Sequence, residues 1–248
     1  MSIIFPSFEK YPELVYGFSE RQHGSMKWSK DSEIYQPCLE NRKIFFLQKN
    51  ISVNDIVTTE LVHGSKVTQV FLSDKGQVVT KTDALMSNEK NIFLTVTGAD
   101  CFPVYFYEPK KRIIGLAHVG WKGLITDIVP NIIEKINSIS GKSYNSVIVG
   151  IGPGIRQCHF SVSLNDLSNY DKYPQAMIKN KTGAFINIPA IIKEQCQAVG
   201  VKTKNIDDVR LCTYCLKERF FSYRRDKPEF LETMIAYLGR SEKLKVKN

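Results

Sequence analysis

The feature that most constrains the fold of this chain is a series of short β-rich runs separated by turn-forming residues. Val, Ile, Leu, Phe and Tyr dominate each run, and Gly, Pro, Asn or Asp bounds it, which is the pattern of strands. We expect strands at residues 14–18, 67–72, 91–97, 104–107, 113–119, 146–151 and 184–188. The chain is therefore expected to fold around β-sheet.

Three helices are predicted between these strands. After Trp121, apolar side chains recur at the spacing of one buried helix face: Leu124, Ile125, Ile128, Val129, Ile132, Ile133 and Ile136. Pro130 lies inside that pattern and should kink the helix or delay its start. A second helix is expected over 189–199, with Gly200 as its end, and a third over 40–49. Grouped strands with helices between them indicate an α+β fold, with mixed β-sheets at the core and helices packed outside.

The composition is that of an ordinary globular protein. Of the 248 residues, 43% are hydrophobic and 24% are charged, which is enough apolar surface for a closed core. No repeat, low-complexity tract or polar linker divides the chain, so we expect a single domain over 1–248. The N-terminus has no signal-peptide pattern, and no apolar run reaches membrane-spanning length. The six cysteines are scattered and do not form a disulfide framework, which predicts a reducing, cytoplasmic location.

The net charge is +9, from 34 Lys and Arg against 25 Asp and Glu. Apart from a short basic C-terminal tail, the positive charges are spread along the chain, and no nucleic-acid-binding motif is found. We therefore predict a solvated surface with a mild preference for anions, and neither a nucleic acid nor a membrane as partner. A monomer or a weak homodimer is expected.

Reactive side chains follow β-rich runs in three segments. They are His63 in ELVHGSKV, Asp100 and Cys101 in FLTVTGADCFPVYF, and His118 in IIGLAHVGWKGL. His63, Cys101 and His118 are far apart in the sequence, so they can converge only through the fold, as the ligands of catalytic metal sites do.

Two imidazoles and one thiolate are a known zinc ligand set that leaves a fourth position for water. Such a metal makes a nucleophile available at neutral pH. Asp100 is a candidate to orient a ligand or transfer protons, although an Asp beside a turn often only forms the turn. Two alternatives stay open from the spacing. The three residues can be core residues, or Cys101 and His118 can form a nucleophilic thiolate–base pair, which leaves His63 without a role.

Cys212 and Cys215 are the only close cysteine pair. No second such pair exists to complete a four-cysteine zinc site, so we expect a structural pair without a redox or metal role. His159 is expected to be a core or surface residue. Trp121 is expected to pack between strand and helix, although a purine can stack on such a ring.

Six motifs resemble those of the YfiH-like family, also labelled laccase-domain, polyphenol oxidase or purine nucleoside phosphorylase. They are VHG at 62–64, TDALMS at 82–87, TGADCFPV at 97–104, HVGWKG at 118–123, IGPGIRQCHFSV at 151–162 and RLCTYCLKERFFSYRRD at 210–226. The resemblance spans roughly residues 14–240 in order. It implies a single layered α+β domain and a zinc site on His63, Cys101 and His118.

The resemblance also implies an activity on purine nucleosides. Family members are linked to phosphorolysis of adenosine, inosine, guanosine and methylthioadenosine, to deamination of adenosine, and to removal of wrongly incorporated peptidoglycan precursors. Phosphate would need fixed cationic donors, for which an Arg fork is suited, and Arg21, Arg224 and Ser222 are the candidate substrate-binding residues. The alternative for each Arg is a surface ion pair. The chain departs from the family pattern at Leu61 and in the loop after Arg21, which puts the substrate preference in doubt.

A four-copper oxidase needs many more histidines than the four in this chain, which argues against a laccase activity. Cu²⁺ can still replace zinc at the triad, because it binds many such sites more tightly. A peptidoglycan-editing amidase or cysteine hydrolase would use the same pocket. The sequence thus favours a zinc-dependent enzyme whose substrates are a purine nucleoside and phosphate.

Overall fold

The computed structural model describes residues 3–141 and 144–241. Within these residues the strands form three sheets. The first has five strands, in the order β1 (Leu14–Phe18), β14 (Met234–Arg240), β6 (Phe93–Gly98), β2 (Ile56–Thr59) and β4 (Val78–Val79). The second has six, in the order β13 (Ile206–Asp208), β9 (Ile148–Ile151), β7 (Phe102–Glu108), β8 (Ile113–Val119), β5 (Ala84–Ser87) and β3 (Val67–Gln69). The third has β10 (Ser161–Ser163), β12 (Gly183–Ile186) and β11 (Met177–Asn180).

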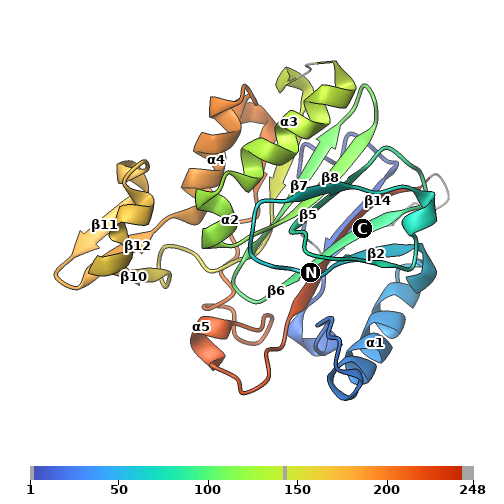
Figure 1. Cartoon of the computed structure of the whole chain (residues 1–248), viewed down its shortest axis with the longest axis horizontal. Coiled ribbons are helices and arrows are strands. Elements are labelled where there is room, and N and C mark those ends of the chain that lie inside the picture. Colours follow the sequence, from blue (N-terminus) through green and yellow to red (C-terminus); the bar gives the residue numbers. More distant parts are fainter. Residues whose placement is uncertain (1–2, 142–143, 242–248) are drawn as a thin grey trace.

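The helices lie mostly outside these sheets (Figure 1). They are α1 (Ser32–Leu47), α2 (Trp121–Ile125), α3 (Ile128–Ser140), α4 (Ile188–Ala198) and the short α5 (Tyr223–Asp226). Short 3₁₀ turns occur at Arg21–His23, Val53–Asp55, Leu72–Asp74, Tyr144–Ser146, Leu164–Tyr170, Pro174–Ala176 and Thr203–Asn205.

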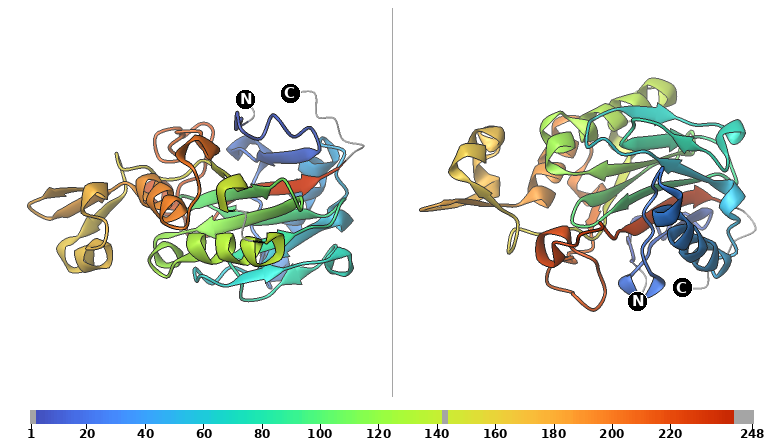
Figure 2. Two further views of the ribbon diagram at one scale, coloured as in Figure 1. Left: turned by 90° about the horizontal axis from the view of Figure 1, so that it is seen from above. Right: turned by 60° about the horizontal axis from the view of Figure 1, so that its bottom comes forward.

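The two larger sheets pack face to face and share a buried core that includes Leu94 and Leu238 from one sheet and Leu116 from the other. Helices α2, α3 and α4 cover the far face of the six-stranded sheet, where Ile132 packs in the same core as Phe106. Helix α1 covers the outer face of the five-stranded sheet. The small sheet projects from one end of these layers (Figure 2). The predicted α+β fold with helices outside mixed sheets is confirmed.

All seven predicted strands are present, and two of them, β1 and β8, have the predicted bounds. The strand predicted at 67–72 ends at Gln69, and Leu72 opens a 3₁₀ turn. The strand predicted at 184–188 ends at Ile186 because Asn187 caps α4 by accepting a hydrogen bond from the amide of Ala190.

The predicted start of the helix at 40–49 is wrong. Helix α1 begins at Ser32, where the Asp31 side chain caps it by accepting a hydrogen bond from Glu33 N at 2.9 Å. Pro37 lies inside this helix and does not end it. Pro130 behaves as predicted and delays a helix: α2 ends at Ile125, Asp127 is left-handed with φ 64°, and Pro130 falls in the first turn of α3.

Among the described residues, no helix combines the length and the apolar character that crossing a membrane requires. The single-domain organisation stays a prediction.

Candidate metal centre

Strand register explains why residues far apart in the sequence meet at one sheet edge. Antiparallel β7 and β8 pair Phe102 with Val119, so Cys101, just before β7, lies at the same end of the sheet as His118. Strand β5 pairs with the other side of β8, and its first residue, Ala84, is opposite Ala117. The residue before β5, Asp83, therefore lies beside His118.

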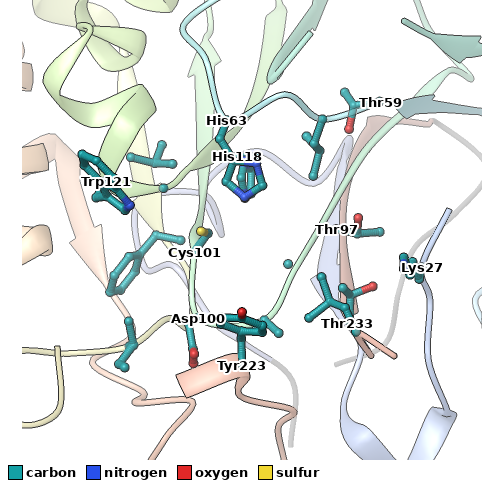
Figure 3. Close-up of a pocket in the computed structure, with 18 of the residues that line it drawn as sticks. Lys27, Thr59, His63, Thr97, Asp100, Cys101, His118, Trp121, Tyr223 and Thr233 are labelled. Carbon is teal, nitrogen blue, oxygen red and sulfur yellow. The ribbon is translucent and has the colours of Figure 1, made fainter. Parts of the chain in front are cut away.

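The three predicted metal ligands converge on a cavity of about 760 Å³ (Figure 3). The Nδ1 or Nε2 atoms of His63 and His118 and the Sγ atom of Cys101 all lie within 4.8 Å of one another. The two imidazole rings meet edge to face, with centroids 4.8 Å apart. His118 is buried, Cys101 is half-buried and His63 is exposed to the cavity, so the group can be reached by a substrate.

Gly120 keeps the space between the three ligands open. A Cβ at this position would lie 2.9 Å from Cys101 Sγ, 3.5 Å from His63 Cδ2 and 3.7 Å from His118 Cε1. A side chain there would enter the ligand group itself, so the glycine is required by the close approach. This packing fits a site whose centre is filled by a small ion.

Asp83 connects two of the ligand segments and is fully buried. Its Oδ1 accepts a hydrogen bond from His63 N at 2.8 Å and lies 3.2 Å from His118 Nδ1, and its Oδ2 accepts from Gly64 N at 2.8 Å. His63 itself is left-handed, with φ 58°, and the Asp83 carboxylate holds the backbone there. A carboxylate behind a metal-binding imidazole is the usual way to orient the ring and fix its tautomer.

Sequence analysis assigned no role to Asp83, although it lies in the TDALMS motif at 82–87. In the sequence, Asp83 directly precedes a short apolar run, and an Asp at such a position is also typical of a turn. Only the register between β5 and β8 shows that it faces His118.

The ionisable groups of Cys101, His118 and Asp83 strongly affect one another's pKa. Burial by itself raises the pKa of the Cys101 thiol, but the neighbouring His118 and His63 rings lower it by more, so that the pKa is about 6. Burial lowers the pKa of His118, yet the Cys101 thiolate and the Asp83 carboxylate raise it to about 9. Each group thus favours the charged form of the other, the thiolate of Cys101 and the imidazolium of His118.

Asp100 lines the same cavity, but its carboxylate oxygens contact the C-terminal part of the chain. Oδ1 accepts a hydrogen bond from Thr213 Oγ1 and Oδ2 accepts one from Arg224 N, both at 2.7 Å. Asp100 has φ 90°, an uncommon conformation for a residue with a side chain. These contacts place Asp100 as a connector between the cavity and the segment that carries Arg224.

Arg224 is the one predicted substrate-binding residue that lines the cavity. Its Nη1 donates to Ser161 O at 3.0 Å and to Ser161 Oγ at 3.2 Å, which are uncharged acceptors. Its guanidinium lies 5.5 Å from the centre of the Phe160 ring. Lys27 and Lys30 also line the cavity, and Lys30 is paired with Glu60, a carboxylate of the same wall, at 2.6 Å. Among the described residues neither Arg224 nor Lys27 forms a side-chain ion pair, although the Asp100 carboxylate on the same wall accepts a hydrogen bond from Arg224 N.

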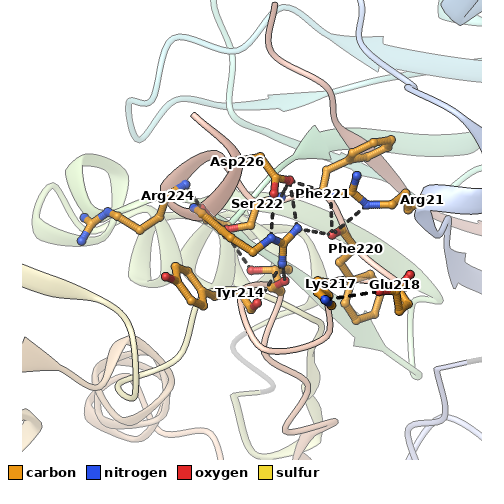
Figure 4. A network of polar contacts seen from close by, with 12 residues as sticks. Arg21, Tyr214, Lys217, Glu218, Phe220, Phe221, Ser222, Arg224 and Asp226 are labelled. Carbon is orange, nitrogen blue, oxygen red and sulfur yellow. Dashed lines mark hydrogen bonds and ion pairs between the residues drawn. The ribbon is translucent and has the colours of Figure 1, made fainter. Parts of the chain in front are cut away.

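The other two predicted substrate-binding residues are not among the described residues that line the cavity. Arg21 Nη2 forms an ion pair with Asp226 Oδ2 at 2.6 Å, and its guanidinium lies over the Phe221 ring (Figure 4). Ser222 is buried and caps α5 by accepting a hydrogen bond from Arg225 N at 3.2 Å. Both contacts hold the turn that presents Arg224, and substrate binding by Arg21 and Ser222 stays a prediction.

The fold and this site together define a class of protein: a layered α+β protein with a His–Cys–His candidate metal centre at one end of its central sheet. Residues 15–239 match the sequence model of the family described as multi-copper polyphenol oxidoreductase laccase. The chain belongs to this family.

Curated relatives carry a different name. The chain is 30% identical to purine nucleoside phosphorylase SERP0752 of Staphylococcus epidermidis, over 94% of both chains. It is 26% identical to purine nucleoside phosphorylase YlmD of Bacillus subtilis, over 86% of this chain and 79% of that protein. Among solved structures it resembles YlmD from Geobacillus stearothermophilus, with a TM-score of 0.88 and 25% identity over 96% of this chain and 94% of that one. Relatives of nearly full length are thus named as enzymes.

Proposed function

We propose that this protein is a zinc-dependent purine nucleoside phosphorylase, acting on adenosine, inosine, guanosine and methylthioadenosine. The observation that carries the proposal is the convergence of His63, Cys101 and His118 on a cavity that is also lined by Arg224 and Lys27. The names of the relatives supply the reaction class.

His63, Cys101 and His118 would hold the metal ion, and the residues around them fit this role. The ligand atoms are close enough for one ion, Gly120 leaves the space between them open, and Asp83 orients His118 from behind. Two nitrogen ligands and one thiolate favour Zn²⁺, with Cu²⁺ as a possible substitute. When bound, zinc supplies a Lewis acid that stabilises negative charge on an oxygen of the substrates.

Phosphate would bind through Arg224 and Lys27. A phosphate carries at least one negative charge at neutral pH, and an Arg fork binds two of its oxygens in one plane. Asp100 acts as a positioning residue in this proposal, because it holds the Arg224 backbone by the hydrogen bond from Arg224 N to its Oδ2. The anion would then lie against the sugar carbon from which the purine leaves.

The nucleoside would be held by the aromatic wall of the same cavity. Trp121, Phe160 and Tyr223 line it, and Trp121 and Tyr223 are more than a third exposed although they are large rings. Exposed aromatic faces in a cavity suit stacking of a purine, and a bound purine would exclude water from the reacting atoms.

Deamination of adenosine is a second candidate reaction at the same site. It is favoured by the ligand set and by Glu60, a carboxylate on the cavity wall that can hold a proton and is paired with Lys30 Nζ at 2.6 Å. Deamination releases ammonia and needs no phosphate, so the two reactions can be told apart directly.

The experiment is turnover of adenosine and inosine by zinc-replete protein, with and without phosphate, followed by chromatography. Release of free base that requires phosphate, and that is abolished in His118→Ala and Cys101→Ala but retained in Cys38→Ala, is expected. Ammonia release from adenosine would establish deamination in addition. No turnover by wild-type protein of confirmed zinc content would overturn the proposal and direct the search to peptidoglycan precursors.

His63→Ala separates the metal centre from a simple Cys–His nucleophile. The thiolate–base pair of Cys101 and His118 does not use His63. Loss of both zinc and activity in His63→Ala therefore supports the metal centre. Full activity of a zinc-free His63→Ala variant, together with sensitivity to thiol alkylation, would assign the chemistry to Cys101 alone.

A further inference from the structure

A second group of metal-ligand side chains lies outside the cavity. The side chains of Cys158, His159, Cys212 and Cys215 bring three sulphurs and one imidazole nitrogen to within 4.8 Å of one another. All the cysteines are free. Cys158 Sγ is 3.7 Å from Cys212 Sγ and 3.6 Å from Cys215 Sγ. We propose that these four residues bind a second zinc ion, with a structural role.

The distances between the sulphurs fit tetrahedral coordination. With Zn–S bonds of about 2.3 Å, two sulphurs on one tetrahedral ion are about 3.8 Å apart. The Nδ1 atom of His159 is 3.2 Å from Cys158 Sγ and 3.3 Å from Cys215 Sγ, so this nitrogen points to the same centre. Three thiolates and one imidazole are a known structural zinc set, and four protein ligands leave no open position for a substrate.

Local structure holds the four ligands in place. The segment from Cys212 to Cys215 forms a tight turn in which Leu216 N donates to Cys212 O at 3.1 Å. Within that turn, the ring of Tyr214 stacks on the ring of His159 at 3.9 Å and 13°, which fixes the plane of the imidazole. Two cysteines separated by two residues in such a turn are the usual half of a structural zinc site.

Sequence analysis predicted a structural pair at Cys212 and Cys215 because no second pair of cysteines was found. The structure supplies the missing half from Cys158 and its neighbour His159, which lie on a turn far away in the sequence. Cys158 and Cys215 are exposed, so an ion can reach the group from solvent.

The second ion would connect the segment that carries Phe160 of the cavity wall with a segment that contacts the wall through Asp100. Cys158 and His159 directly precede Phe160, and Thr213, between the two other cysteines, donates to Asp100 at 2.7 Å. Asp100 in turn accepts from Arg224 N. An ion at this point would hold the Phe160 and Arg224 side of the cavity without touching a substrate.

The test is the zinc content of reduced, zinc-replete protein, measured by mass spectrometry of the metal. We expect about two zinc ions per chain in wild type, about one in Cys215→Ser and about one in Cys101→Ala, and none in the double variant. Cys38→Ala is the matched control, because Cys38 belongs to neither group, and it should keep both ions. One ion in wild type that disappears in Cys101→Ala, or two ions retained in Cys215→Ser, would overturn the proposal.

A second measurement does not depend on the folding of Cys215→Ser. Co²⁺ added to Cys101→Ala, in which the four proposed ligands are intact, should produce thiolate-to-cobalt charge transfer and the strong d–d bands of a tetrahedral site. Their absence overturns the proposal, as does an intact mass under native conditions that shows two of the thiols joined as a disulfide. These readouts report metal binding alone, so they stand whether or not the protein turns over nucleosides.

Discussion

The carboxylate of Asp83 lies 3.2 Å from Nδ1 of His118, and the same oxygen accepts a hydrogen bond from the backbone of His63 at 2.8 Å. One buried side chain therefore positions two of the three proposed metal ligands. Hydrogen bonds from His118, His63 and Gly64 outweigh burial and keep the pKa of Asp83 below its ordinary value, so the carboxylate is ionised at neutral pH.

Asp83→Asn should weaken zinc binding about 10- to 100-fold, the usual effect of removing a carboxylate behind a metal-binding imidazole. The amide keeps the size of the side chain but loses the charge that holds His118. Competition with a chromophoric chelator measures the affinity. Asp74→Asn is the matched control, since Asp74 also accepts a backbone hydrogen bond, from Phe71 N at 2.8 Å, but in an exposed turn. An Asp83→Asn protein with wild-type zinc affinity would contradict this role.

Gly120→Ala should abolish zinc binding while the protein stays folded. The added Cβ would lie 2.9 Å from Cys101 Sγ, in the space between the three ligands. Zinc content and circular dichroism measure the two effects separately. Gly64→Ala is the matched control at the same site, because its Cβ would meet atoms no closer than 3.6 Å. If Gly120→Ala binds zinc as wild type does, the ion does not lie between these ligands.

Arg224→Ala should raise the KM for phosphate roughly 10- to 100-fold, the effect of losing about 1.5–3 kcal/mol from a charged hydrogen bond. Arg21→Ala should raise that KM less, because the Arg21 guanidinium does not line the cavity and acts only through its ion pair with Asp226 in the turn that presents Arg224. Steady-state phosphorolysis at varied phosphate concentration measures the KM of both variants. A larger rise in the KM for phosphate in Arg21→Ala than in Arg224→Ala would support the substrate-binding role that the sequence predicted for Arg21.

The stability of the fold should depend on Asp208 at low pH. Burial raises the pKa of Asp208, but hydrogen bonds from Arg156, Arg210 and Lys193 lower it from 3.8 to about 2. Because the folded pKa is the lower one, the folded state gains about 2 kcal/mol above pH 4, and this gain is lost as the pH falls to 2.

Urea unfolding of wild type and Asp208→Asn between pH 7 and pH 2 measures this contribution. The difference in free energy of unfolding should be largest above pH 4 and should shrink towards pH 2. Asp207→Asn, one residue away, serves as the control, since Asp207 accepts a hydrogen bond from Ser7 N and forms no described ion pair. A difference between wild type and Asp208→Asn that does not change with pH would contradict the shift.

Sequence analysis predicted correctly the strands and helices that are encoded by short stretches of the chain. Strands β1 and β8 and the split helix after Trp121 follow from short apolar patterns and from Pro130. Sequence analysis did not predict β14, which lies between β1 and β6 in the five-stranded sheet, and its pairing with these strands joins segments that are far apart in the chain. The helix predicted at 40–49 begins instead at Ser32, where the Asp31 side chain caps it, and Pro37 is accommodated inside it.

The sequence by itself determined the α+β class, the family and the identity of the three candidate ligands, because these depend on residue patterns and motifs along the chain. Only the tertiary structure decided which polar residues meet. The pairing of β5 with β8 places Asp83 behind His118, and the packing of two distant turns brings Cys158 and His159 to Cys212 and Cys215. Strand register and turn packing arise from contacts between segments far apart in the chain, and no local pattern encodes them.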